Sequence, residues 1–239
     1  MKRLADIVIS LTGLLISAPL LLPVLIIIWL RDFQSPFYIA PRVGKNGIAF
    51  KMVKLRSMVV GADRTGVDST SNKDPRITPI GKFVRAYKLD ELSQLWNVLI
   101  GDMSLVGPRP NVRRAVEQYT SVEQRLLSVR PGITDISSIV FSDEGDILKE
   151  SKDPDLDYSQ LIRPWKSRLG LFYVENGSLG LDILLLILTV IAVFSRRKAL
   201  VGIEKILRTL EADETLIRVA RRDEPLTPFM PPGAEVFDQ

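Results

Sequence analysis

The sequence contains no cysteine and no histidine among its 239 residues. The absence of cysteine excludes disulfides and thiolate nucleophiles, and the two absences together exclude Cys/His zinc sites and Ser-His-Asp triads. Any acid–base or metal chemistry must then use carboxylates, lysine, tyrosine or an oxygen-liking cation such as Mg²⁺. Net charge is small as well. The 32 Lys and Arg against 28 Asp and Glu leave +4, which suits an anionic partner without naming one.

Hydrophobic residues are what the sequence has in excess. They make up 46% of the chain, and residues 7–30 form an uncharged apolar run. As a straight helix this run would be about 36 Å long, whereas the hydrocarbon core of a bilayer is ~30 Å thick. One spanning helix is the ordinary interpretation. However, Pro19 and Pro23 remove backbone donors in the middle of the run, and Lys and Arg flank both of its ends, as in cytoplasmic loops. A helix that breaks at Pro19 and enters and leaves by one face fits equally well.

Local patterns predict a mostly helical α+β chain. Residues 37–60 indicate short strands and turns, and residues 61–73 a polar, mobile loop. Thr78 and Pro79 have the form of a helix N-cap and first residue, and a second helix is expected to begin near Asp90 and end at Gly101.

The second half of the chain gives further local predictions. They are a helix at 112–127, a turn at 130–134, a strand at 136–141, an acidic loop at 143–157, an apolar helix at 179–194, a charged helix at 201–222 and a disordered tail from residue 224. We expect three parts: a membrane helix (1–36), a central domain (37–200) and a C-terminal helix with a Pro-rich tail (201–239).

The adjacent carboxylates Asp90 and Glu91 are the sharpest candidates for chemistry. They also fit a purely structural role, because Asp caps helices and Glu suits a first helical turn. Cations accompany them in the sequence: Arg85 shortly upstream, Arg109 between two prolines, and Lys51, Lys54 and Arg56 on a predicted basic strand. Paired carboxylates among cations fit phosphoryl transfer, in which a protein positions groups and neutralises charge.

Such chemistry would call for a metal ion. A carboxylate that attacks a diphosphate brings like charges together, and one such pair at ~4 Å costs ~4 kcal/mol at an effective dielectric constant of ~20. Mg²⁺ together with two or three Arg or Lys side chains can turn this net repulsion into attraction. Mg²⁺ is commonly held by one or two carboxylates plus substrate phosphates, and Glu91 or Asp182 could supply them.

Several stretches together resemble the bacterial sugar transferase family, the monotopic polyprenyl-phosphate phosphoglycosyl transferases. They are KRLAD (2–6), FKMVKLRSM (50–58), the long block 74–110, RPGIT (130–134) and YVENGSLGLD (173–182). The resemblance implies an enzyme on the cytoplasmic face of the bacterial inner membrane, held by a re-entrant helix and interfacial helices. Such enzymes transfer a sugar 1-phosphate from a UDP-sugar to undecaprenyl phosphate and release UMP, in the first membrane step of polysaccharide or glycoconjugate synthesis.

The resemblance also implies roles for individual residues. Asp90 matches the nucleophile that forms a covalent phosphosugar intermediate, and Glu91 matches a residue that helps to hold Mg²⁺. The remaining matches to substrate- or metal-contacting positions are Lys54, Arg56, Arg85, Arg109 and Asp182, the last as a metal ligand.

The chain departs from the family pattern in three places. Ala18 precedes Pro19 where many relatives have serine, and Ser17 lies one residue earlier. The segment after RPGIT differs from the family pattern, so the sequence does not identify the sugar. The tail beyond about residue 200 lies outside the shared pattern. Two other functions stay open: a non-catalytic membrane-surface protein that binds anionic lipid or a partner, and a nucleotide-sugar hydrolase. We expect no nucleic-acid partner, and apolar faces at 183–194 and 203–219 could pair two subunits.

Overall fold

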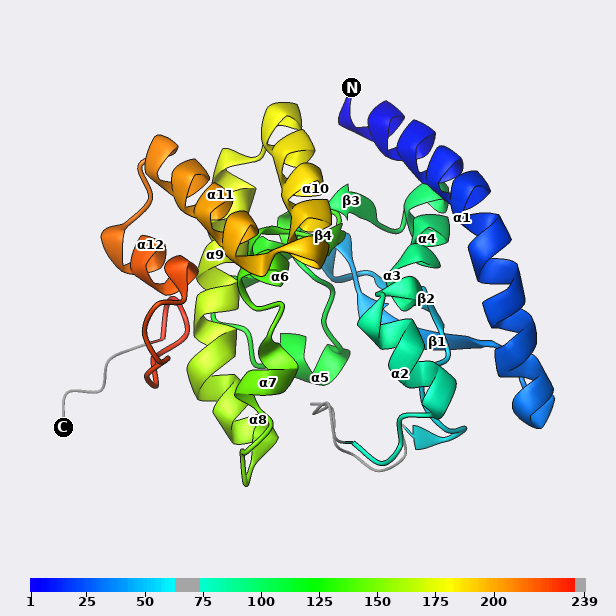
Figure 1. Ribbon diagram of the computed structural model, residues 1–239. Helices are drawn as coiled ribbons and strands as arrows, with labels where there is room; N and C mark the ends of the chain where they lie inside the picture. The colour runs from blue at the N-terminus through cyan, green and yellow to red at the C-terminus, as the bar shows by residue number, and fades with distance from the viewer. Residues whose placement is uncertain (63–73, 235–239) are drawn as a thin grey trace.

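The computed structural model describes residues 1–62 and 74–234, so the predicted loop at 61–73 lies almost wholly outside the described residues. The fold is mostly helical with two small sheets, as predicted (Figure 1). The strands are β1 (Phe37–Val43), β2 (Ala49–Leu55), β3 (Ser104–Val106) and β4 (Gly132–Thr134). The helices up to the middle of the chain are α1 (Lys2–Asp32), α2 (Pro79–Ala86), α3 (Leu89–Leu92), α4 (Leu95–Ile100) and α5 (Arg113–Val116).

The second half of the chain is mostly helical. Its α-helices are α6 (Ile136–Val140), α7 (Glu144–Ile147), α8 (Pro154–Asp157), α9 (Arg163–Asn176), α10 (Leu179–Phe194), α11 (Arg196–Thr209) and α12 (Glu214–Arg221). Short turns of other helix types are η1 (Lys45–Gly47), η3 (Glu123–Ser128) and the π-helical η4 (Tyr158–Ile162). The predicted division of the chain at residues 36 and 200 stays a prediction.

Helix α1 is continuous from Lys2 to Asp32, with both prolines inside it. The predicted break at Pro19 is therefore not an interruption, but Figure 1 shows that α1 changes direction partway along its length. Proline explains such a bend, because its missing N–H and its ring weaken the preceding turn. Ser17 Oγ donates to the carbonyl oxygen of Leu14 at 3.3 Å, a local bond that also favours bending.

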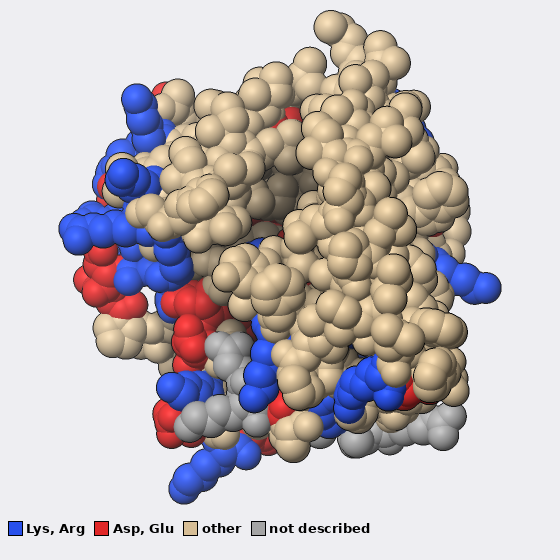
Figure 2. All heavy atoms as spheres, turned by 45° about the vertical axis from the view of Figure 1, so that its right-hand side comes forward, with Lys and Arg blue, Asp and Glu red and all other residues tan. Residues whose placement is uncertain are grey.

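One side of α1 packs on the protein, and the other side is exposed and apolar. Its residues Leu21, Val24 and Ile28 are buried against side chains of β2, α2 and α3. On the opposite side Leu15 and Ile16 are 68% and 75% exposed. Figure 2 shows a broad surface without charged side chains on this side of the molecule, with Lys and Arg gathered at its lower end. Among the described helices, α1 alone is long and apolar enough to cross a membrane.

The two sheets position the loops of the central region. Strands β1 and β2 pair antiparallel, with Tyr38 opposite Lys54. Strands β3 and β4 pair parallel, so residues 132–134 of the predicted turn form a strand. Gly107 and Gly132 allow the close approach after β3, since a Cβ on Gly132 would lie 2.1 Å from the Gly107 nitrogen. This crossing fixes the Pro108–Pro110 loop beside β4.

Two local predictions in the middle of the chain are wrong. Residues 136–140 form helix α6 and not a strand, because Asp135 Oδ1 accepts from Ser138 N at 2.7 Å and caps a helix. The predicted helix at 112–127 is reduced to α5 and η3. Between them Thr120 N donates to Glu123 Oε2 at 3.0 Å and Glu123 N donates to Thr120 Oγ1 at 3.1 Å, the reciprocal bonding that starts a new helical turn.

Other predictions are confirmed or adjusted. Helix α2 begins as expected, with Thr78 Oγ1 accepting from Gly81 N at 2.9 Å. The helix expected near Asp90 is two short helices, α3 and α4, and Gly101 ends α4 in the left-handed conformation with φ 98°. Helix α10 has the predicted bounds, whereas the acidic loop contains α7 and α8.

The C-terminal part packs back onto the main core. The predicted helix at 201–222 is split into α11 and α12 at Glu211, where φ is 54°. Its apolar residues Ile203, Leu207, Leu216 and Ile217 are buried within the chain, so this face is not free to pair subunits. A dimer through 183–194 stays a prediction.

The described part of the tail, residues 224–234, is ordered, and here the prediction of disorder is wrong. We call it the C-terminal strap. Phe229 packs against Trp165 of α9 with ring centroids 4.4 Å apart, and Phe229 N donates to the Gln160 oxygen at 3.0 Å. Arg168 donates to the Met230 oxygen at 2.7 Å. These contacts bury aromatic surface that the strap would otherwise expose, which explains why a Pro-rich segment is held in place.

Candidate functional site

The site forms where β2 meets α3. Lys54 lies near the end of β2 and Asp90 in the first turn of α3, and Lys54 Nζ is 3.9 Å from Asp90 Oδ2. Among the described residues, no side chain donates a closer bond to the Asp90 carboxylate. The Asp90 side chain is mostly buried, and its carboxylate oxygens remain free to contact a substrate. This suits a nucleophile better than a helix cap.

Two buried polar residues that the sequence analysis missed hold these elements together. Asn97 of α4 accepts from Val53 N at 2.9 Å and donates to the Lys51 oxygen at 2.7 Å, so it bonds to the backbone on both sides of Met52. Ser93 Oγ donates to the oxygen of Asp90 at 2.8 Å and lies 3.2 Å from the oxygen of Val53. The signal in the sequence was Asn97 itself, a polar residue inside the apolar stretch LWNVLI.

Arg109 reaches the site from the loop that follows β3. Its Nη1 is 3.3 Å from Glu91 Oε1 and 3.3 Å from the carbonyl oxygen of Ile133 in β4. Its backbone is restricted by the flanking prolines, and Gly132 N donates to the Pro108 oxygen at 3.1 Å. The guanidinium is therefore fixed beside the second carboxylate of the pair.

Arg85 completes the group of cations. It extends from α2, and its Nε donates to Ser57 Oγ at 3.0 Å. Burial lowers the pKa of Arg85, and the nearby Asp90 and Asp74 carboxylates oppose that shift. The structure thus brings together five predicted residues: Lys54, Arg85, Asp90, Glu91 and Arg109.

Burial shifts the pKa values of both members of the central pair toward their neutral forms. It raises the pKa of Asp90, against the attraction of Lys54, and Glu91 raises it further. Burial and the nearby Arg109 charge lower the pKa of Lys54 to about 8. At Arg109 burial is outweighed by Glu91 and Asp90, which raise its pKa. Opposed shifts in one buried cluster are common at reactive sites.

The other two predicted residues lie elsewhere. Arg56 Nη2 donates to Asp32 Oδ1 at 2.7 Å and to the Ile28 oxygen at 3.3 Å, so it fastens the end of α1. Asp182 Oδ1 accepts from the Tyr173 hydroxyl at 2.6 Å, and its other oxygen pairs with Lys2 at 2.5 Å. Asp182 thereby ties the start of α1 to α10.

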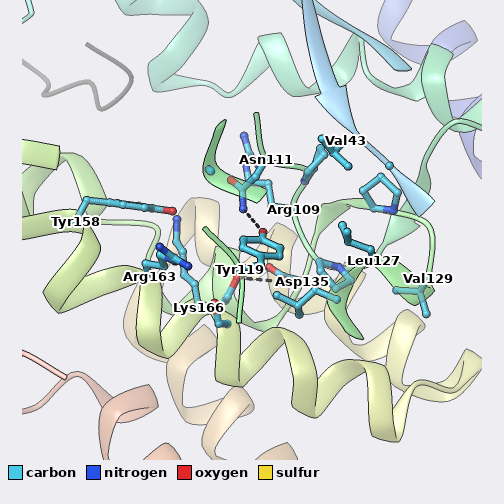
Figure 3. A pocket seen from close by; sticks show the side chains of 18 residues that line it. Val43, Arg109, Asn111, Tyr119, Leu127, Val129, Asp135, Tyr158, Arg163 and Lys166 are labelled. Atoms are coloured by element: carbon cyan, nitrogen blue, oxygen red, sulfur yellow. Dashed lines mark hydrogen bonds between the residues drawn. The ribbon is translucent and has the colours of Figure 1, made fainter. Parts of the chain in front are cut away.

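Arg109 also lines an open cavity (Figure 3). Loop 107–111, Tyr119 and α9 form part of its walls. The polar side chains that line it are Arg109, Asn111, Tyr119, Asp135, Ser137, Tyr158, Arg163, Lys166 and Ser167. Of the predicted site residues only Arg109 lines this cavity, and nothing in the sequence predicted it, because its walls come from segments far apart along the chain.

The donor set was tested for a divalent cation. No group of three or more acidic side chains in the described ranges could hold a metal ion by itself. Asp90 and Glu91 nevertheless fit Mg²⁺, which takes one or two carboxylates and completes its shell with phosphates and water. The carboxylate of Asp182 is engaged by Lys2 and Tyr173, and its role as a metal ligand stays a prediction.

Comparisons with known proteins identify the family to which the chain is similar. The family model described as bacterial sugar transferase matches residues 1–196. The chain is 36% identical over 214 residues to the UDP-galactose-lipid carrier transferase of Erwinia amylovora, and 34% identical over 202 residues to the UDP-glucose:undecaprenyl-phosphate glucose-1-phosphate transferase of Klebsiella pneumoniae. These alignments cover 82% and 83% of the chain.

The chain spans only 41% of the length of each of those two relatives. A third relative, the exopolysaccharide production protein ExoY of Sinorhizobium fredii, is 33% identical over 207 residues, which cover 80% of the chain and 84% of that protein. The matched region contains every residue of the site described above. The chain belongs to the bacterial sugar transferase family.

Proposed function

We propose that this protein transfers a sugar 1-phosphate from a UDP-sugar to undecaprenyl phosphate and releases UMP. The observation that carries the proposal is the Asp90 carboxylate, buried and 3.9 Å from Lys54, with Arg85 and Arg109 close enough to affect its pKa. The name of the Klebsiella pneumoniae relative states this kind of transfer.

The chemistry proceeds by two displacements at one phosphorus atom. An Asp90 oxygen attacks the phosphorus that bears the sugar, and the bond from that phosphorus to the bridging oxygen breaks with its electron pair leaving on UMP. A phosphate oxygen of the lipid then attacks the same phosphorus, and the bond to Asp90 breaks and restores the carboxylate. Two steps allow a water-soluble donor and a lipid acceptor to use one site in turn.

The cations lower the barrier to both steps. Lys54, Arg85 and Arg109 oppose the repulsion between the Asp90 carboxylate and the diphosphate, and they are already in place before the substrate binds. Glu91 is the proposed Mg²⁺ ligand, with Asp90 beside it. When bound, the ion supplies further positive charge at the phosphate oxygens.

The protein is proposed to sit on the cytoplasmic face of the bacterial inner membrane. Both ends of α1 are fastened to the same protein body: Arg3 donates to the carbonyl oxygens of Val98 and Leu99, and Arg56 holds the end at Ile28 and Asp32. The exposed apolar side of α1 then faces the lipid while the body stays at the headgroups. This arrangement supports a re-entrant rather than a spanning helix.

The topology can be tested in membranes. Cysteines introduced at positions 1 and 60 of this cysteine-free chain are expected to react with a membrane-impermeant maleimide from the cytoplasmic side only. The reason is that both ends of α1 contact one body. Labelling of the two positions from opposite sides would refute the re-entrant topology and favour a spanning helix.

We expect kcat/KM to fall at both acidic and alkaline pH. Because the pKa of Lys54 is lowered to about 8, its positive charge is lost, and the rate falls, as the pH rises through about 8. Because burial raises the pKa of Asp90, the carboxylate is protonated, and the rate falls, at a higher pH than for an ordinary aspartate. In Lys54→Arg the alkaline fall should move well above pH 8, since arginine stays charged. An unchanged alkaline limb in this variant would contradict the assignment.

The test of function is UMP release by the purified protein in lipid nanodiscs with Mg²⁺ and a UDP-sugar. We expect sustained release only when undecaprenyl phosphate is present, with a sugar-diphospholipid as the second product. Sustained UMP release without the lipid would favour a hydrolase. No release with any of several UDP-sugars would favour a non-catalytic membrane protein.

A further inference from the structure

Arg109 belongs to two sites at once. On one side it contacts Glu91 at 3.3 Å, and on the other it lines the cavity between loop 107–111 and α9. In phosphoryl transfer the attacking and leaving oxygens lie roughly in line through the phosphorus. If a phosphate binds at Arg109 and Asp90 attacks it, the leaving group lies opposite Asp90, and the cavity that Arg109 also lines offers a place for it.

The walls of the cavity combine apolar surface with cations that lie beside aromatic rings. Lys166 lies 5.4 Å from the Tyr158 ring centre, and Arg163 lies 5.8 Å from the Tyr119 ring centre (Figure 3). Both cations are also held by carboxylates, Glu144 and Glu123 respectively. The cavity lining is thus largely apolar but carries paired charges, and aromatic rings contribute flat surface to it.

Tyr119 and Asn111 place a donor and an acceptor side by side in this cavity. Asn111 Nδ2 donates to the Tyr119 hydroxyl at 2.6 Å, which leaves the Tyr119 O–H and Asn111 Oδ1 to bond to a ligand; the described residues offer no closer partner for either. Burial raises the pKa of Tyr119 to about 12, so the hydroxyl keeps its proton at any working pH. An adjacent donor and acceptor match a carbonyl oxygen and the neighbouring N–H on the edge of uracil.

We propose that this cavity seats the uridine of the donor, with the Tyr119 hydroxyl and Asn111 Oδ1 bonded to the edge of the base. The inference rests on the proposed function and deepens it, because it assigns separate places to the two halves of the donor. The sugar 1-phosphate stays at Asp90, where the lipid phosphate arrives, and UMP leaves from the cavity beyond Arg109.

The test measures equilibrium binding of UMP to the purified full-length protein in nanodiscs by isothermal titration calorimetry, which needs no turnover. Tyr119→Phe should weaken UMP binding about 3- to 10-fold, the usual cost of one hydrogen bond, and Asn111→Ala at least as much. Binding of ribose 5-phosphate, which has no base, should be unchanged in Tyr119→Phe. The matched control is Tyr87→Phe, at a side chain that is 63% exposed on the end of α2 and away from the cavity.

Unchanged UMP binding in Tyr119→Phe and Asn111→Ala would overturn the inference, as would an equal loss for ribose 5-phosphate. If a variant does not fold, the wild-type protein is used instead. Photolysis with 5-azido-UMP should label peptides within 109–119 or 158–167, and labelling confined to other segments would overturn the inference. Measurement of turnover distinguishes failure of the uridine site from failure of the proposed function. If UMP release depends on the lipid but UMP binding does not change in Tyr119→Phe, only the uridine site is rejected. If lipid-dependent UMP release is absent, the proposed function is rejected.

Discussion

Asp90→Asn is expected to lower UMP release by about 10⁴-fold or more, the scale of loss seen when a covalent nucleophile is removed. The amide has nearly the same shape as the carboxylate but cannot displace UMP from phosphorus. The variant should also form no adduct with a UDP-sugar alone. The wild-type protein should gain the mass of a sugar phosphate, located on Asp90 by peptide mapping. Intact-protein mass spectrometry and a UMP assay measure the two effects together.

Asp223→Asn is the matched control, because Asp223 is exposed and pairs only with Arg221 in the surface contacts that the structure describes. It should keep full turnover and a normal adduct. Glu91→Gln should still form some adduct but at a much lower rate, since it removes a proposed Mg²⁺ ligand rather than the nucleophile. An adduct on Asp90→Asn, or on Glu91 in the wild-type protein, would refute the assignment of the nucleophile.

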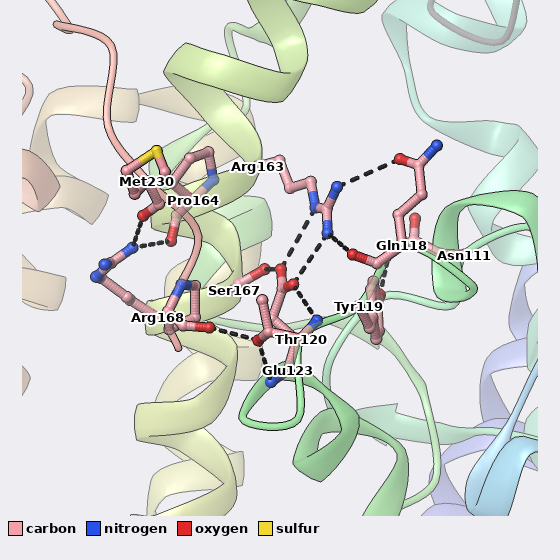
Figure 4. A network of polar contacts seen from close by, with 11 residues as sticks. Asn111, Gln118, Tyr119, Thr120, Glu123, Arg163, Pro164, Ser167, Arg168 and Met230 are labelled. Atoms are coloured by element: carbon pink, nitrogen blue, oxygen red, sulfur yellow. Dashed lines mark hydrogen bonds and ion pairs between the residues drawn. The ribbon is translucent and has the colours of Figure 1, made fainter. Parts of the chain in front are cut away.

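Glu123→Ala is expected to produce the largest loss of stability, about 3–5 kcal/mol, because it removes the buried partner of an ion pair. Glu123 is 0% exposed, and its carboxylate accepts from Arg163 at 2.9 Å, Ser167 Oγ at 2.6 Å and Thr120 N at 3.0 Å (Figure 4). Its removal leaves the Arg163 guanidinium with its bonds to Gln118 and opens the turn before η3. The midpoint of thermal unfolding should fall by roughly 10 °C.

The control for Glu123→Ala is Glu175→Ala, which breaks an ion pair of similar length. Glu175 and Arg125 are 2.8 Å apart, but both side chains are about half exposed. Exposed pairs of this kind contribute ~0–1 kcal/mol, so Glu175→Ala should shift the midpoint by no more than ~3 °C. Equal shifts of the unfolding midpoint in the two variants would show that the buried Glu123 ion pair stabilises the fold no more than the exposed one.

The sequence predicted the candidate site better than the surrounding structure. Asp90, Glu91 and Arg109 could be singled out because paired carboxylates among cations fit phosphate chemistry, and the structure brings them together. Asp182 was predicted as a metal ligand from the resemblance, and that role stays a prediction. Its contacts with Lys2 and Tyr173 could not be read from the sequence, because they join segments far apart along the chain.

The errors in local structure have a common cause, which is that distant contacts override local preference. Residues 136–140 are rich in β-branched Ile and Val and favour a strand, yet the Asp135 cap makes them a helix. The tail looked disordered by composition, yet Trp165 and Arg168 of α9 hold the C-terminal strap. The cavity beside Arg109 could not be predicted at all, since loop 107–111 and α9 meet only in the folded chain.

The fastening of α1 at both ends has a kinetic consequence. In the proposed function, a protein body held in this way would keep the Asp90 carboxylate at one height and meet its lipid acceptor by lateral diffusion. Its turnover should follow the number of acceptor molecules per unit area of bilayer rather than their bulk concentration. Adding inert phospholipid at constant total acceptor would therefore slow the reaction, simply by diluting the two-dimensional surface on which the partners meet.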